Sequence, residues 1–180
     1  MAKNQSTKER LAGSGGVRMS EGIRIERPVE DVFDFWRNLS NLPRFMTYVD
    51  RIDVINHGVD GQSHWVVKGP GGITLEWDAQ IINEHRPSLI AWKSIGSADV
   101  ASAGSVKFTP LGAESTDVEV TLQYDPPAGK VGAGMAAVVG LSPEKVLRED
   151  LVRLKQLLES SDWRIGTDAA QLSLNSRGEV

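Results

Sequence analysis

Alternating apolar and polar residues predict β-strands along most of the chain. In the segment 117–124, Val118, Val120, Leu122 and Tyr124 alternate with polar residues, which is the period of a strand exposed to water on one face. Similar patterns predict six further strands, at 23–25, 51–56, 63–68, 73–83, 89–94 and 105–109. The sequence therefore predicts seven strands.

Apolar residues at helical spacing predict two main helices. The first begins after Pro28, and its apolar stripe is formed by Val29, Val32, Phe33 and Trp36. A short helical turn through Pro43 and Phe45 follows it. The second helix begins near Pro143, and its stripe is formed by Leu147, Leu151, Leu154 and Leu158.

The order of these elements determines the expected fold class. A strand, a helix, a short helix, six strands and a long helix follow one another without any βαβ alternation. This order predicts an α+β fold with an antiparallel sheet. A sheet that is wet on one face has one apolar face to cover, and the C-terminal helix is the element available to cover it.

The hairpin around Gly69-Pro70-Gly71-Gly72 allows its register to be predicted. Placing Trp65 opposite Trp77 keeps large apolar side chains together across the two strands. This pairing needs a three-residue loop, 70–72, in which glycine suits a position with positive φ. A shift by one residue would place Trp65 opposite Glu76 and turn the apolar face to water. We therefore expect Glu76 to point outward.

Composition indicates a single soluble domain of 180 residues with 40% apolar and 24% charged residues. We expect this domain to span 20–160, between a flexible basic tail at 1–19 and a polar tail at 161–180 that holds a lone Trp163.

The absence of cysteine excludes disulfides and zinc-thiolate sites. The low-charge stretch 131–141 is too short to span a bilayer, and a net charge of −4 gives no reason to expect nucleic-acid binding. A cytoplasmic location is expected.

Candidate catalytic and metal-binding residues form no recognisable cluster. The three histidines, His57, His64 and His85, lie in separate segments, so we expect no metal site. Glu76 and Asp78 share the wet face of one strand, where a solvated pair is a better interpretation than a general acid and base. The glycine-rich loop lacks the Lys-Ser/Thr ending of a phosphate-binding loop, and no GxSxG motif is present. We expect no cofactor.

Several stretches in this order resemble the START-like superfamily, also called SRPBCC or the helix-grip fold, and within it the polyketide cyclase/dehydrase-type branch. They are Arg27 to Phe33, Leu42 to Met46, Ser63 to Trp65, Glu76-Trp77, Ile90 to Trp92 and Arg148 to Leu151. The resemblance covers roughly residues 20–160. It implies a curved seven-stranded antiparallel sheet that grips the C-terminal helix, with an apolar cavity between them.

The resemblance also gives the inward-facing rings a role. Each tryptophan suits either a packed core or a pocket wall, and the family favours the wall. We expect the cavity to be lined by Trp65, Trp77, Trp92, Leu75, Phe108, Tyr124, Met135 and Phe45. Arg44 and Tyr48 are candidate polar contacts for a ligand. Met135 belongs to the glycine-rich segment 129–140, which we expect to form a flap at the cavity mouth.

Three functions are compatible with this reading. The first is the binding of a small hydrophobic molecule such as a lipid, quinone or polyketide, by a monomer or a dimer. The second is a cyclase or dehydratase acting on a polyketide-like substrate, which the missing acid/base cluster disfavours. The third is a protein-interaction or chaperone-regulator module, which the polar outer face of residues 74–80 disfavours.

Overall fold

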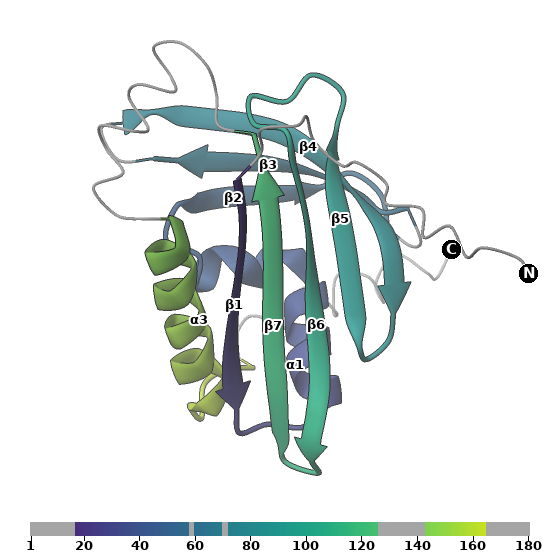
Figure 1. The fold of residues 1–180 in the computed structure, drawn as a ribbon, viewed down its shortest axis with the longest axis vertical. Helices are drawn as coiled ribbons and strands as arrows, with labels where there is room; N and C mark the ends of the chain where they lie inside the picture. The colour runs from purple at the N-terminus through teal and green to yellow at the C-terminus, as the bar shows by residue number, and fades with distance from the viewer. Residues whose placement is uncertain (1–16, 58–59, 70–71, 126–142, 165–180) are drawn as a thin grey trace, which may run out of the picture.

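The computed structural model describes residues 17–57, 60–69, 72–125 and 143–164 (Figure 1). Its elements, in chain order, are β1 (Val17–Ile25), α1 (Val29–Arg37), the 3-10 helix η1 (Leu39–Arg44), β2 (Val49–Val54), β3 (Gln62–Lys68), β4 (Thr74–His85), β5 (Leu89–Ile95), β6 (Ser102–Gly112), β7 (Ser115–Tyr124) and α3 (Pro143–Glu159).

The strands form one seven-stranded antiparallel sheet in the order β1-β7-β6-β5-β4-β3-β2. In Figure 1, β2, β3 and β4 run across the view while β1, β6 and β7 run down it, so the sheet is strongly bent. Of the helices, α3 contacts β1, α1 contacts β6 and β7, and η1 contacts β2. The α+β helix-grip fold expected from the sequence is confirmed. None of the helices in the described residues is long and apolar enough to cross a membrane.

The predicted register of the β3–β4 hairpin is also confirmed. Trp65 lies opposite Trp77, and Val67 lies opposite Leu75. Gly72 has a φ of 79°, a conformation that glycine adopts without steric cost. Both tryptophans therefore lie on the concave face of the bent sheet, and the other face of β4 is the wetter one.

A chain of aromatic contacts joins α1 to the sheet. The ring of Phe33 meets Phe108 of β6 edge to face at 5.4 Å between centroids, and Trp36 meets the same ring at 6.2 Å. Trp36 also lies 5.4 Å from Phe45, directly after η1. The buried stripe of α1 predicted from its spacing thus packs on the concave face. Phe35 is buried as well, on a side of the helix that the stripe did not include.

Trp163 explains the burial of Phe35. The two rings lie 6.4 Å apart, and only 9% of Trp163 is exposed. The guanidinium groups of Arg27 and Arg164 lie over the indole at 5.6 and 4.7 Å. Trp163, which the sequence placed in a polar tail, is thus buried against Phe35 of α1 and two arginine side chains, although its neighbours in sequence are polar.

The first strand is longer than its sequence pattern indicated. It begins at Val17, inside the segment expected to be a flexible tail. The alternation is broken by Glu21, which lies opposite Val120 on the concave side and pairs with Arg148 of α3 at 2.6 Å. The hydrogen bond from Arg148, more than its charge, lowers the pKa of Glu21 below its ordinary value. Because Glu21 interrupts the apolar alternation, the sequence pattern did not reveal the first part of this strand.

The C-terminal helix is tied to the segment after η1 by a buried carboxylate. Asp150 is 8% exposed, and its Oδ1 accepts hydrogen bonds from the amide and hydroxyl of Thr47 at 3.0 and 2.8 Å. Arg153 donates to the same carboxylate and, at 3.0 Å, to the carbonyl oxygen of Phe45. This network fixes α3 against the chain that leads into β2.

On the convex face, His64 lies between two carboxylates of β4. Its Nδ1 is 2.8 Å from Asp78, and its Nε2 is 3.4 Å from Glu76. The hydrogen bond with Asp78, reinforced by both negative charges, raises the pKa of His64 above its ordinary value of 6.5. The imidazolium form is therefore favoured by folding.

We expect His64→Gln to lower stability more at acidic than at basic pH. A raised pKa in the folded state stabilises the protein fully below about pH 6.5, and this contribution is lost as the pH rises through the raised value. The effect is at most about 1 kcal/mol, since the side chain is partly exposed. Thermal midpoints at pH 5.5 and 8.5 measure it. His85→Gln, at an exposed position, is the matched control. Equal losses at both pH values for His64→Gln would contradict the expectation.

Candidate ligand-binding site

A stacked pair of tryptophans forms part of the concave face. The rings of Trp65 and Trp77 lie 6.1 Å apart with 12° between their planes. Both side chains are half-buried, although they are large and apolar. The indole Nε1–H of Trp65 donates to Oγ of Ser63 at 2.9 Å, which fixes the ring along β3. Their placement follows from period-2 alternation in the two paired strands.

A third tryptophan occupies space that a glycine leaves free. Trp92 lies opposite Ile81 of β4 on one side and Gly104 of β6 on the other. A Cβ atom at Gly104 would lie 2.5 Å from Cζ2 of Trp92 and 2.9 Å from the carbonyl oxygen of Thr121. Neither distance is sterically acceptable. The absence of a side chain at Gly104 therefore lets the indole of Trp92 lie against the sheet.

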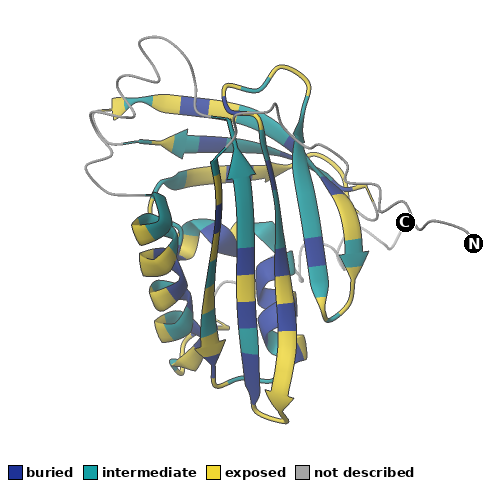
Figure 2. Cartoon of the chain, viewed as in Figure 1, coloured by how far each residue is buried: buried dark blue, intermediate teal, exposed yellow. Residues whose placement is uncertain are grey.

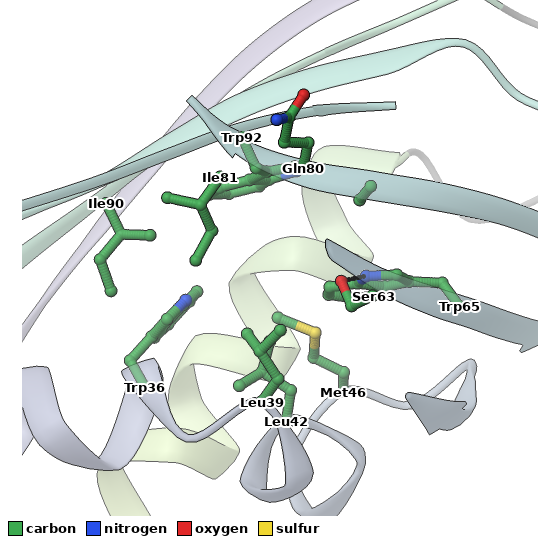
Figure 3. Close-up of a pocket in the computed structure, with 11 residues that line it drawn as sticks. Trp36, Leu39, Leu42, Met46, Ser63, Trp65, Gln80, Ile81, Ile90 and Trp92 are labelled. Atoms are coloured by element: carbon green, nitrogen blue, oxygen red, sulfur yellow. Dashed lines mark hydrogen bonds between the residues drawn. The ribbon is translucent and has the colours of Figure 1, made fainter. Parts of the chain in front are cut away.

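A small hollow of about 30 Å³ lies beside these rings (Figure 3). Its lining residues come from α1, η1, the segment after η1, β3, β4 and β5. They are Trp36, Leu39, Leu42, Met46, Ser63, Trp65, Ala79, Gln80, Ile81, Ile90 and Trp92. The polar side-chain groups of this set are the Ser63 hydroxyl, the Gln80 amide and the indole N–H groups of the three tryptophans, and Figure 3 shows the Gln80 amide directed away from the hollow. The wall is otherwise formed by apolar and aromatic side chains.

The family resemblance implied a cavity between the sheet and the C-terminal helix. The lining of this hollow instead includes α1 and η1, and no described residue of α3. The bend of the sheet carries β3 and β4 over η1, while α3 packs along β1 (Figure 1). The burial colours in Figure 2 alternate along the strands, with the darkest bands of β6 and β7 where the helices lie behind them.

The predicted lining residues fall into different environments. Trp65 and Trp92 line the hollow, and Trp77 adjoins it through its stack with Trp65. Leu75 is 5% exposed and lies on the same face, beyond the lining. Tyr124 is half-buried at the end of β7, where burial and then the charge of Glu144 raise the pKa of its phenol above 10.

Phe108 and Phe45 belong to the packed core instead of the wall of this hollow. They are 1% and 2% exposed, and both contact Trp36. Phe108 lies on the inner face of a strand, as the wall tryptophans do, but α1 covers it, and Phe45 directly follows η1, where Trp36 of α1 contacts it. Met135, with the whole segment 129–140 expected to form a flap, lies outside the described residues.

The two candidate polar contacts lie away from the hollow's lining. The guanidinium of Arg44 lies 5.3 Å from the ring of Phe35 and donates to Oδ1 of Asn41 and the carbonyl oxygen of Trp163. These contacts give Arg44 a structural role. Tyr48 is half-buried, and its carbonyl oxygen accepts a hydrogen bond from the amide of Lys68.

Several lining residues were not anticipated. Ser63 and Ile81 were detectable, because they alternate in phase with Trp65 and Trp77 on the predicted inner face. Leu39, Leu42 and the other helix residues carried no such signal, since the sequence does not show which part of the sheet a short helix covers.

The titratable residues considered from the sequence do not face the hollow. His64, Glu76 and Asp78 form their cluster on the opposite face of the sheet. Across the described ranges, no group of three or more His, Asp or Glu side chains is placed to hold a metal ion. The lining of the hollow therefore offers apolar contact, aromatic stacking, indole N–H groups and a serine hydroxyl.

Comparison with known proteins gives this architecture a family. Residues 16–159 match the family described as polyketide cyclase / dehydrase and lipid transport. The match spans most of the chain, including every strand and α3. The chain belongs to this family, whose START-like fold typically accommodates hydrophobic ligands.

Individual relatives support the same assignment. An uncharacterized 17.2 kDa protein of Streptomyces lincolnensis is 27% identical over 151 residues, which cover 83% of this chain and 94% of that protein. A crystal structure from Deinococcus radiodurans is 31% identical, with a TM-score of 0.61 over 78% of this chain and 95% of the other. An aromatase/cyclase from a Streptomyces species has a TM-score of 0.66 over 81% of this chain and 94% of its own, at 15% identity, which shows the shared fold alone.

Proposed function

We propose that this protein binds a small hydrophobic molecule on the concave face of its sheet, at the tryptophan-lined hollow. The observation that carries the proposal is the stacked, half-buried pair Trp65 and Trp77 beside an apolar hollow that Trp92 also lines. Large aromatic side chains that stay partly uncovered retain apolar area for a ligand to bury. The family to which the chain belongs includes lipid transport in its description, which agrees with this role.

The volume of the hollow limits how a ligand can bind. At about 30 Å³ it holds one small group, whereas pockets for drug-sized ligands occupy roughly 300–1,000 Å³. A larger ligand would place one end in the hollow and displace part of its wall. Met46 is suited to such a shift, because its unbranched thioether side chain adapts to irregular shapes at little cost. Met46 and Leu39 both project into the region beneath the sheet (Figure 3).

The expected result is that purified protein binds a neutral apolar fluorophore, N-phenyl-1-naphthylamine, and that Trp77→Ala weakens this binding about ten-fold. Loss of the ring removes one stacking surface, worth about 0.5–1.5 kcal/mol beyond area burial. Fluorescence titration gives Kd for each protein, and circular dichroism verifies that each is folded at the titration temperature.

Trp77→Phe is the matched control, because it keeps a flat aromatic surface opposite Trp65. Its Kd should lie closer to wild type than to that of Trp77→Ala. Native mass spectrometry of freshly purified protein tests the same proposal without a probe, through the mass of any co-purified molecule. Absence of both fluorophore binding and a co-purified molecule would refute the proposed function.

A further inference from the structure

Ser63 is the one residue in the lining of the hollow that carries a hydroxyl group. It is a buried serine, 4% exposed, in a wall of apolar and aromatic side chains. Its Oγ accepts a hydrogen bond from Nε1–H of Trp65 at 2.9 Å. This bond holds the hydroxyl in place and occupies one of its two acceptor lone pairs, while its own proton remains to be donated.

Within the described residues, the Ser63 hydroxyl proton has no hydrogen-bonded acceptor. Gln80, the other polar residue of the lining, directs its amide away, as Figure 3 shows. A buried donor without an acceptor is unfavourable, because it has lost its hydrogen bond to water without gaining another. An acceptor atom carried by a ligand would satisfy this donor.

We infer that Ser63 determines the specificity of the site by donating a hydrogen bond to a carbonyl oxygen at the inserted end of a hydrophobic ligand. The inference rests on the proposed function and deepens it, since it assigns the ligand a chemical class: an apolar molecule that carries a carbonyl group. The small hollow matches a group of that size. Trp65 positions Ser63, and the stacked rings of Trp65 and Trp77 lie beside the body of the ligand.

A pair of probes that differ by one atom group tests the inference. 2-Acetylnaphthalene carries a ketone, and 2-isopropenylnaphthalene has nearly the same shape with a methylene group in place of the oxygen. The ratio of their Kd values for wild type is compared with the ratio for Ser63→Ala, so that general changes in the pocket cancel. We expect the preference for the ketone to fall about five-fold in Ser63→Ala, which corresponds to the net contribution of one hydrogen bond. Its affinity for the hydrocarbon should stay within two-fold of wild type.

Two further variants separate Ser63 from its neighbours. Ser94→Ala removes a half-buried serine of β5 that accepts a hydrogen bond from the amide of Ser102 at 3.0 Å, and it should leave the ratio unchanged. Trp65→Phe removes the indole that positions Ser63 but keeps the hydroxyl, so it should reduce the ketone preference less than Ser63→Ala does.

Each other outcome counts against a defined claim. Binding of both probes with an unchanged ratio in Ser63→Ala would overturn the inference and leave the proposed function standing. Loss of the preference in Trp65→Phe, with its retention in Ser63→Ala, would assign the donor to the indole and also overturn the inference. If wild type binds neither probe, the proposed function fails, and the role of Ser63 fails with it.

Discussion

Replacing Phe108 with alanine is expected to lower the free energy of unfolding by about 3–5 kcal/mol. The ring is 1% exposed and contacts both Phe33 and Trp36, so its removal leaves a cavity between α1 and β6 that the rigid sheet cannot close. Urea denaturation followed by circular dichroism measures the change. This result would identify Phe108 as a residue of the packed core, which the sequence had placed in the wall of the cavity.

Leu111→Ala is the matched control for this substitution. Leu111 lies on the same strand, but 52% of it is exposed, so its truncation should change stability by no more than about 0.5 kcal/mol. A loss below about 1 kcal/mol for Phe108→Ala would show instead that the ring borders empty space. In that case the cavity extends further beneath β6 than the hollow beside the tryptophans.

Substituting Asp150 with alanine is expected to lower the free energy of unfolding by about 2–3 kcal/mol. The change leaves the amide of Thr47 and the guanidinium of Arg153 without the buried carboxylate that accepts from both. The estimate is at the lower end for a buried ion pair, because the Arg153 side chain is 40% exposed. Differential scanning calorimetry and urea denaturation measure the loss.

Asp150→Asn and Glu149→Ala are the controls for this prediction. The asparagine variant keeps a side-chain oxygen that can accept from Thr47, so it should be less destabilising than alanine. Glu149 is the exposed neighbour on the same helix, and its contact with Lys145 is 3.9 Å long, so its loss should change stability by less than about 0.5 kcal/mol. Similar losses for Glu149→Ala and Asp150→Ala would contradict the role assigned to the network.

The two predictions concern the two longer helices that pack on the sheet, α1 and α3. Phe108 anchors α1 to the sheet, and Asp150 anchors α3 to the chain around Thr47. The hollow lies beside the first of these contacts, where Trp36 is shared by the core and the lining. We therefore expect the stability of the α1 packing to set how far the wall of the hollow can move when a ligand enters.

Local patterns in the sequence were sufficient to predict the sheet and the register of its clearest hairpin. A shift of one residue would have exposed Trp65 and Trp77 and buried Glu76, so the apolar pattern alone selected the observed pairing. The same argument placed His64 on the wetter face, where it meets Asp78. A glycine with positive φ in the hairpin loop was likewise expected from the sequence, and Gly72 has this conformation.

The sequence by itself thus determined the fold class, the strand pairing and the concave position of the rings, because these follow from alternation and from the need to cover one apolar face. Only the tertiary structure decided which inward-facing rings pack and which remain partly open. Phe108 and Phe45 are core because α1 covers them, whereas Trp65 and Trp92 border the hollow where the sheet bends over η1. The burial of Trp163 had the same origin, since its apolar neighbours come from a helix distant in sequence. Burial depends on what lies opposite a residue in space, and no periodicity within one strand or helix contains that information.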